Sequence, residues 1–177
     1  MIKRINQFFK NIVYGFKPLD EEYIDRYLSG SEKKIFLRLK KSEQYHSILI
    51  AKALEKDALE NERSNKNELV RLALFHDIGK TEYPMNIVEK SIAVILRKML
   101  KDKLKRLEKL EFISSSLYHG ERGEEILRRE GVFDSSPYCY QVVGLHHHQL
   151  EALKEKSSLS EDFYTAFALL KKYDDLN

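Results

Sequence analysis

Helical periodicity runs through almost the whole chain of 177 residues. Apolar residues recur three or four positions apart, and no segment of useful length alternates between apolar and polar residues as a half-buried strand does. The sequence has only seven glycines and three prolines, and it contains no internal repeat. Hydrophobic and charged residues make up 42% and 33% of the chain, as in an ordinary soluble globular protein. The pattern predicts an all-α fold, a single compact bundle of about seven to nine helices.

Caps and helix breakers predict where these helices begin and end. We expect short helices over about 18–29 and 31–39, with Ser31 as a cap, a longer helix that starts at Ser42, and a helix that ends at His76-Asp77. One long helix, or two end to end, is expected over 87–110, followed by helices over about 120–129, 136–150 and 160–174. We interpret residues 1–41 as N-terminal helices packed on a core domain formed by residues 42–177.

The N-terminal segment, residues 1–16, combines apolar residues at helical spacing with Lys3, Arg4 and Lys10. It lacks the continuous apolar block of about 7 to 15 residues that a signal peptide requires. The chain also lacks an apolar run near the roughly 20 residues of a transmembrane segment. The segment is interpreted as an amphipathic helix packed on the domain. Weak membrane contact is the alternative, because interfacial helices carry apolar and basic residues on opposite faces.

Charge and cysteine content say little about partners. A net charge of +3 does not indicate a stable nucleic-acid complex. Seven basic residues lie between 97 and 109, where they predict a solvated helix face or a positive rim that attracts a phosphorylated substrate. Nucleic-acid cleavage along this segment is a further alternative, which predicts binding that weakens steeply with salt. Cys139 cannot form an internal disulfide and is expected to be a small packed residue in a cytoplasmic protein.

The dipeptide His76-Asp77 ends an apolar helical run and is followed directly by Ile78, Gly79 and Lys80. An adjacent imidazole and carboxylate offer a divalent metal one nitrogen and one oxygen ligand from a single turn. The chain has six histidines, and all of them fall where they can complete such a site. The further candidates are His46, His119, His146, His147, His148 and the acid pair Asp174-Asp175.

Metal ions held by such ligands can neutralise negatively charged oxygens and make a water reactive near neutral pH, the two things that phosphate-ester hydrolysis requires. One metal is satisfied by His46, His76, Asp77 and Asp174. The additional His119, His146 and His147 then favour a second metal about 3.5 to 4 Å away, with Asp77 as the bridge. Iron or manganese is the expected pair of ions, although mixed histidine and carboxylate ligands also accept Zn, Co or Ni.

The order His46, His76-Asp77, His119, His146-His147, Asp174 resembles the HD superfamily of metal-dependent phosphohydrolases, in the subgroup whose HDIG motif is followed by lysine. The segment from Tyr118 to Gly123 resembles the family's later histidine-and-glycine segment, and the likeness covers roughly residues 42–177. It implies that a metal-activated hydroxide attacks phosphorus in line. It also implies that Asp77 and Lys80 are catalytic residues and that Lys80 contacts the substrate phosphate.

Two ligand positions and the substrate stay open at this stage. His146 and His147 follow the aliphatic pair Val142-Val143 at the family spacing, but His147 with His148 is the alternative, and Asp175 is the alternative to Asp174. The Gly-Tyr-Pro motif of the branch that cleaves cyclic di-GMP is absent after His148. The expected substrate is a small phosphomonoester or phosphodiester of nucleotide type. The alternative function is a non-catalytic signalling module that binds a metal or a nucleotide.

Overall fold

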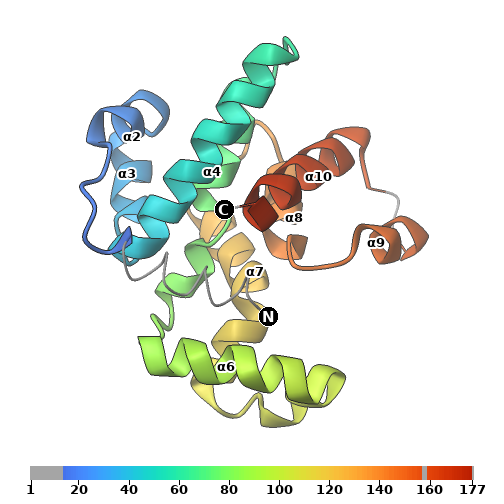
Figure 1. Ribbon diagram of the computed structural model, residues 1–177. Coiled ribbons are helices and arrows are strands. Elements are labelled where there is room, and N and C mark those ends of the chain that lie inside the picture. The colour runs from blue at the N-terminus through green and yellow to red at the C-terminus, as the bar shows by residue number, and fades with distance from the viewer. Residues whose placement is uncertain (1–13, 157–158, 177) are drawn as a thin grey trace.

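Nine α-helices and two 3-10 helices make up the residues that the computed structural model describes, 14–156 and 159–176, and no strand occurs among them (Figure 1). The predicted all-α fold is therefore confirmed. The helix expected over residues 1–16 lies almost entirely outside the described residues. In chain order the elements are α2 (Glu21–Tyr27), α3 (Gly30–Phe36), α4 (Lys41–Glu60), α5 (Lys66–Phe75), η1 (Ile78–Thr81), α6 (Ile87–Leu100), η2 (Lys101–Leu107), α7 (Glu111–Arg129), α8 (Tyr138–Leu145), α9 (Leu150–Lys156) and α10 (Glu161–Leu176).

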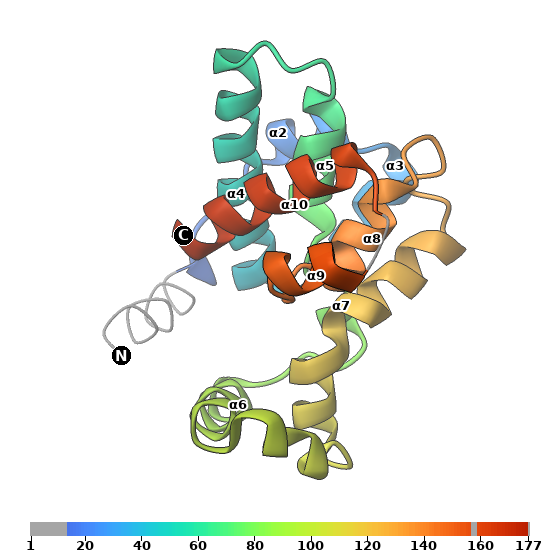
Figure 2. The same cartoon turned by 90° about the vertical axis from the view of Figure 1, so that its right-hand side faces the viewer.

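The main hydrophobic core surrounds α5, which packs against α4, α8 and α10 (Figures 1 and 2). The six residues from Leu69 to Phe75 other than Arg71 are completely buried. A helix that is apolar on all sides is stable only in the interior. The Phe75 ring meets Phe36 and Phe133 edge-on, at centroid distances of 6.3 and 6.2 Å. The C-terminal end of α5, where His76 follows, is thereby fixed inside the bundle.

A second, smaller core holds α6 and η2 against the first half of α7. We call α6, η2 and this part of α7 the α6 lobe. In Figures 1 and 2 the lobe lies at the opposite end of the molecule from α2. Lys90 of α6 lies 2.6 Å from the Glu43 carboxylate of α4, and Lys40 donates to the Met85 carbonyl. These contacts tie the lobe to the main bundle. Among the described helices, none is both long and apolar enough to cross a membrane.

Two predicted helix boundaries, the start of α7 and the end of α8, are wrong. α7 begins at Glu111 rather than near Gly120, because the buried Ile113 and Ser115 extend its packed face through a serine run. The segment predicted as one long helix or two end to end forms two: α6 ends at Leu100, where Lys101 adopts a left-handed φ of 47°, and η2 follows directly. α8 ends at Leu145, and α9 is a separate helix. Smaller shifts occur at the start of α3, which Ser29 caps instead of Ser31, and of α4, which begins at Lys41.

The C-terminal end of α10 is held on α4 by Asp57, a carboxylate that is 7% exposed. The Tyr173 hydroxyl donates to Asp57 Oδ2 at 2.8 Å, and Arg63 Nε lies 3.2 Å from Oδ1. Burial raises the pKa of Asp57, but the hydrogen bonds from Tyr173 and Arg63 outweigh it and hold the pKa below its usual value. Because Asp174 follows Tyr173 directly, this contact also fixes where Asp174 lies.

This contact predicts a pH-dependent loss of stability. A carboxylate with a lowered folded-state pKa stabilises the fold above its unfolded value of about 3.9, and the contribution disappears as the pH falls through the folded pKa. We expect Asp57→Asn to lower the free energy of unfolding by about 1 to 3 kcal/mol at pH 7. The gap to wild type should shrink below about pH 4. Urea unfolding of both proteins at pH 7 and pH 3 measures this difference in the free energy of unfolding. An equal difference at both pH values would contradict a stabilising role for the charged form of Asp57.

Candidate metal centre

The candidate metal centre is built around the turn that follows α5. His76 is the C-terminal cap residue of α5, Asp77 comes next, and η1 begins at Ile78. Gly79 lets this turn lie directly on α7, because a Cβ at this position would lie 1.9 Å from the His119 carbonyl oxygen and 2.6 Å from the Gly123 nitrogen. The close approach brings the Asp77 carboxylate to the His119 side chain.

Asp77 is 2% exposed and has one carboxylate oxygen near each of two sets of imidazoles. Its Oδ1 lies 3.5 Å from His119 Nε2 and 3.8 Å from His146 Nε2. Its Oδ2 lies 3.5 Å from His76 Nε2. Two groups of donor atoms able to hold a cation result, and Asp77 belongs to both. The first consists of Asp77, His119, His146 and His147, and the second of His46, His76 and Asp77, with the donor atoms of each group within 4.8 Å of one another.

The second group is extended by Asp174, which reaches it from α10. Asp174 Oδ1 lies 3.0 Å from His46 Nε2 and 4.0 Å from His76 Nε2. Burial raises the pKa of Asp174, but the hydrogen bond from His46 and the nearby His76 lower it to about 2. Asp174 is therefore an anion at neutral pH, as a metal ligand must be. Asp175 is exposed and belongs to neither group among the described residues.

Three of the histidines are oriented by backbone carbonyls. The Nδ1 atoms of His76, His119 and His146 lie 2.8, 3.1 and 2.7 Å from the carbonyl oxygens of Ala73, Ser115 and Val143. Because a carbonyl can only accept, each Nδ1 carries a proton and donates it. In the neutral ring, Nε2 then keeps its lone pair and points at Asp77. Hydrogen bonds of this kind typically orient the histidine ligands of a metal.

Two observations show that the donor set fits a cation. His146 Nε2 is buried and has no hydrogen-bond partner among the described residues, although a buried polar atom without a partner is costly. Burial and the neighbouring His119 and His76 rings lower the pKa of His146 to about 3, so the ring is neutral and its lone pair is available. The Nε2 atoms of His147 and His119 are 2.5 Å apart, and two lone pairs this close require a shared proton or a cation.

Lys80 extends from η1 toward the same carboxylate and forms an ion pair with Asp77 Oδ2. Burial lowers the pKa of Lys80, but the Asp77 and Glu43 carboxylates outweigh it and raise the pKa above its usual value. Lys80 is thus an ammonium at neutral pH. The pKa of Asp77 is raised by burial, but the Lys80 ammonium and the adjacent His76 and His119 side chains outweigh this and hold the pKa well below its usual range. The centre therefore combines a buried anion with an adjacent cation.

The structure brings together the seven side chains predicted as ligands, from five places in the chain. His46 comes from α4, His119 from α7 and Asp174 from α10, while His76 and Asp77 follow α5. His146 and His147 follow α8. His147 is exposed as a residue, but desolvation of its ring by the surrounding protein and the adjacent His146 and His119 rings lower its pKa. His148 is exposed and lies in neither group among the described residues. The geometry therefore favours the pair His146 and His147 over His147 and His148.

The sequence did not single out Glu43, which is 5% exposed and acts on both Lys80 and Lys90. Its spacing to His46, one helical turn along α4, is a signal that could have found it.

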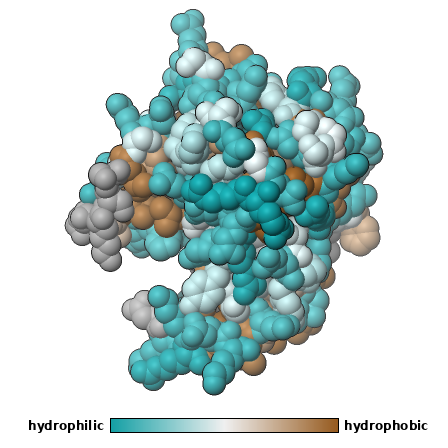
Figure 3. Space-filling view, turned by 180° about the vertical axis from the view of Figure 1, so that it is seen from behind, coloured by the Kyte–Doolittle hydropathy of each residue, from teal (hydrophilic) through white to brown (hydrophobic). Residues whose placement is uncertain are grey.

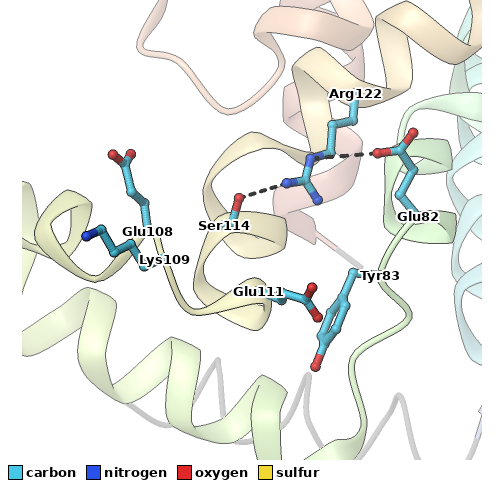
Figure 4. A pocket seen from close by; sticks show the side chains of 7 residues that line it. All are labelled: Glu82, Tyr83, Glu108, Lys109, Glu111, Ser114 and Arg122. Carbon is cyan, nitrogen blue, oxygen red and sulfur yellow. Dashed lines mark hydrogen bonds and ion pairs between the residues drawn. The ribbon is translucent and has the colours of Figure 1, made fainter.

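A separate cavity of about 290 Å³ is lined by none of the candidate ligands (Figure 4). In it, Arg122 donates to Ser114 Oγ at 2.7 Å and pairs with Glu82 at 3.8 Å. The full lining is Glu82, Tyr83, Glu108, Lys109, Glu111, Ser114 and Arg122.

Comparison with known proteins places the chain in a family. The family model described as the HD domain matches residues 44–168, more than half of the chain, and the chain belongs to this family. The matched range includes the candidate ligands from His46 to His147, together with Lys80, and ends before Asp174. No curated protein and no solved structure matched. HD domains are generally metal-dependent hydrolases, which agrees with a buried histidine and aspartate cluster able to hold a cation.

Proposed function

We propose that the protein is a phosphohydrolase that depends on two divalent transition-metal ions, iron or manganese in the first place. The observation that carries the proposal is the position of Asp77, shared by two groups of donor atoms with one oxygen toward each. Bound cations would neutralise phosphoryl oxygens and make water reactive near neutral pH, which are the two requirements of phosphate-ester hydrolysis. His119, His146 and His147 would hold one ion, and His46, His76 and Asp174 the other.

The side chains of the protein have their own roles in this proposal. Carbonyl contacts hold His76, His119 and His146 with Nε2 toward the reaction site, so the ligand geometry exists before a substrate arrives. Lys80 is a cation whose side chain is 23% exposed, and the N–H donors that Asp77 leaves unused can bind a phosphoryl oxygen of a substrate. We infer that the substrate is a small phosphomonoester or phosphodiester of nucleotide type.

Metal content and turnover test this proposal together. Protein purified without chelator should contain close to two equivalents of transition metal and should hydrolyse at least one member of a panel of nucleotide phosphomonoesters and phosphodiesters. Removal of the metal by a chelator should abolish turnover, and Fe(II) or Mn(II) should restore it. Less than one equivalent of metal, with no turnover on any substrate after metal addition, would refute the proposal.

A further inference from the structure

Helix α6 is apolar on two sides, and only one of them is covered by the described residues. Its inner side packs on the small core of the α6 lobe through the buried Ala93 and the partly buried Leu96 and Leu100. The outer side exposes apolar side chains to water, which is unfavourable unless a partner covers them. Six aliphatic side chains on this helix are between 41% and 73% exposed, and they are Ile87, Val88, Ile92, Val94, Ile95 and Met99.

Four of these side chains form one continuous stripe. Val88, Ile92, Ile95 and Met99 follow each other at spacings of four, three and four residues, which places them on one line along a helix. The 14 residues of α6 make the helix about 21 Å long. The other exposed large apolar residues, such as Leu37 and Leu59, lie on different elements. Contiguous exposed apolar surface of this kind marks an interaction site.

A strongly basic segment overlaps the end of the stripe in the chain and extends beyond it. Residues 97–109 contain seven Lys or Arg and two acidic residues, a net charge of +5. Six of the basic side chains are exposed and form no ion pair with another described residue; they are Lys98, Lys101, Lys103, Lys105, Arg106 and Lys109. Seen from behind, the lower lobe presents mainly hydrophilic residues, with hydrophobic ones along part of its edge (Figure 3). The partner must therefore accept aliphatic side chains and also carry negative charge.

We propose that the outer side of α6 and the adjoining basic segment 98–109 dock on a membrane surface that carries anionic headgroups. Interfacial helices bury an apolar stripe at the acyl boundary while basic side chains bind anionic lipids. A second copy of the chain fits less well, because one helix about 21 Å long and roughly 10 Å wide covers far less than the 800 Å² or so per partner of a stable interface. The proposal is independent of the metal centre.

Vesicle binding by the whole chain tests this surface. We expect sedimentation with vesicles of phosphatidylcholine and phosphatidylserine, and little with phosphatidylcholine alone. Ile95→Gln/Met99→Gln should weaken binding at least about tenfold, because each buried aliphatic side chain contributes substantially to partitioning. Lys101→Gln/Lys103→Gln/Lys105→Gln should also weaken it at least about tenfold. The matched control Leu37→Gln/Leu59→Gln, at exposed leucines elsewhere, should bind as wild type does.

Four outcomes would overturn the proposal. One is the absence of binding to anionic vesicles. A second is binding that neither Ile95→Gln/Met99→Gln nor Val88→Gln/Ile92→Gln weakens, which would assign it to another segment, such as residues 1–16. A third is a dimer that the stripe variants dissociate, without vesicle binding. The fourth is preferential binding of an acidic peptide or nucleic acid through the same residues. All these substitutions are at exposed positions, so the variants are expected to fold. Urea midpoints equal to that of wild type would verify this.

Discussion

Replacing Asp77 with asparagine is expected to lower turnover by about 10³-fold or more, the scale found when a group central to the chemistry is removed. Asp77 is the one residue that belongs to both groups of donor atoms among the described residues. An asparagine keeps the shape but removes the negative charge that His119, His146 and Lys80 face. Metal content should therefore fall below that of wild type, as measured on the same chelator-free preparation. Turnover and metal content together report on the centre.

Asp175→Asn is the matched control for this substitution. It removes the same charge at an exposed position next to Asp174, and it should leave turnover and metal content within about twofold of wild type, as expected for a surface change. Loss of both properties in Asp175→Asn, with Asp77→Asn unaffected, would contradict the assigned centre. A wild-type protein that binds nucleotide without hydrolysing it, and an Asp77→Asn variant that binds it equally, would support the non-catalytic module instead.

The part of the centre nearest to α5 could be predicted from local sequence. The apolar residues from Leu69 to Phe75 leave no side for solvent apart from Arg71, so the helix had to be buried and His76-Asp77 had to follow it into the interior. The meeting of His46, His119 and Asp174 is different, because helical periodicity places each on a face but does not say which faces meet. That expectation came from the order of the residues along the chain, through the family resemblance.

Other features depend on tertiary contacts that the sequence does not encode locally. Ser114 to Ser116 have modest helix propensity, and only packing of Ile113 on the small core shows that α7 includes them. The break at Lys101 requires a left-handed φ at a lysine, which no residue pattern announces. Periodicity also predicted the apolar positions of α6. It could not predict that one side of the helix stays exposed, because the sequence pattern does not determine which apolar residues other elements cover.

Gly79→Ala is expected to lower the free energy of unfolding by roughly 3 kcal/mol or more, at the upper end of overpacking effects. The new methyl group would overlap the His119 carbonyl oxygen and the Gly123 nitrogen. Both are backbone atoms of α7, so they cannot turn away as a flexible side chain can. Separation of η1 from α7 would relieve the overlap and would also move Asp77 away from His119. Metal content should therefore fall in this variant, even at temperatures where it stays folded.

Gly30→Ala is the control, because no atom lies within 4 Å of a Cβ added at Gly30 in α3. Alanine loses less backbone entropy than glycine in a helix, so this variant should be as stable as wild type or more stable by up to about 1 kcal/mol. Urea unfolding of both variants beside wild type measures the difference, and metal analysis supplies the second reading. Equal stability of the two variants would mean that η1 does not rest on α7 as closely as described. The geometry of Asp77 would then lack its structural support, because the contact of η1 with His119 and Gly123 is what sets the Asp77 carboxylate opposite the His119 ring.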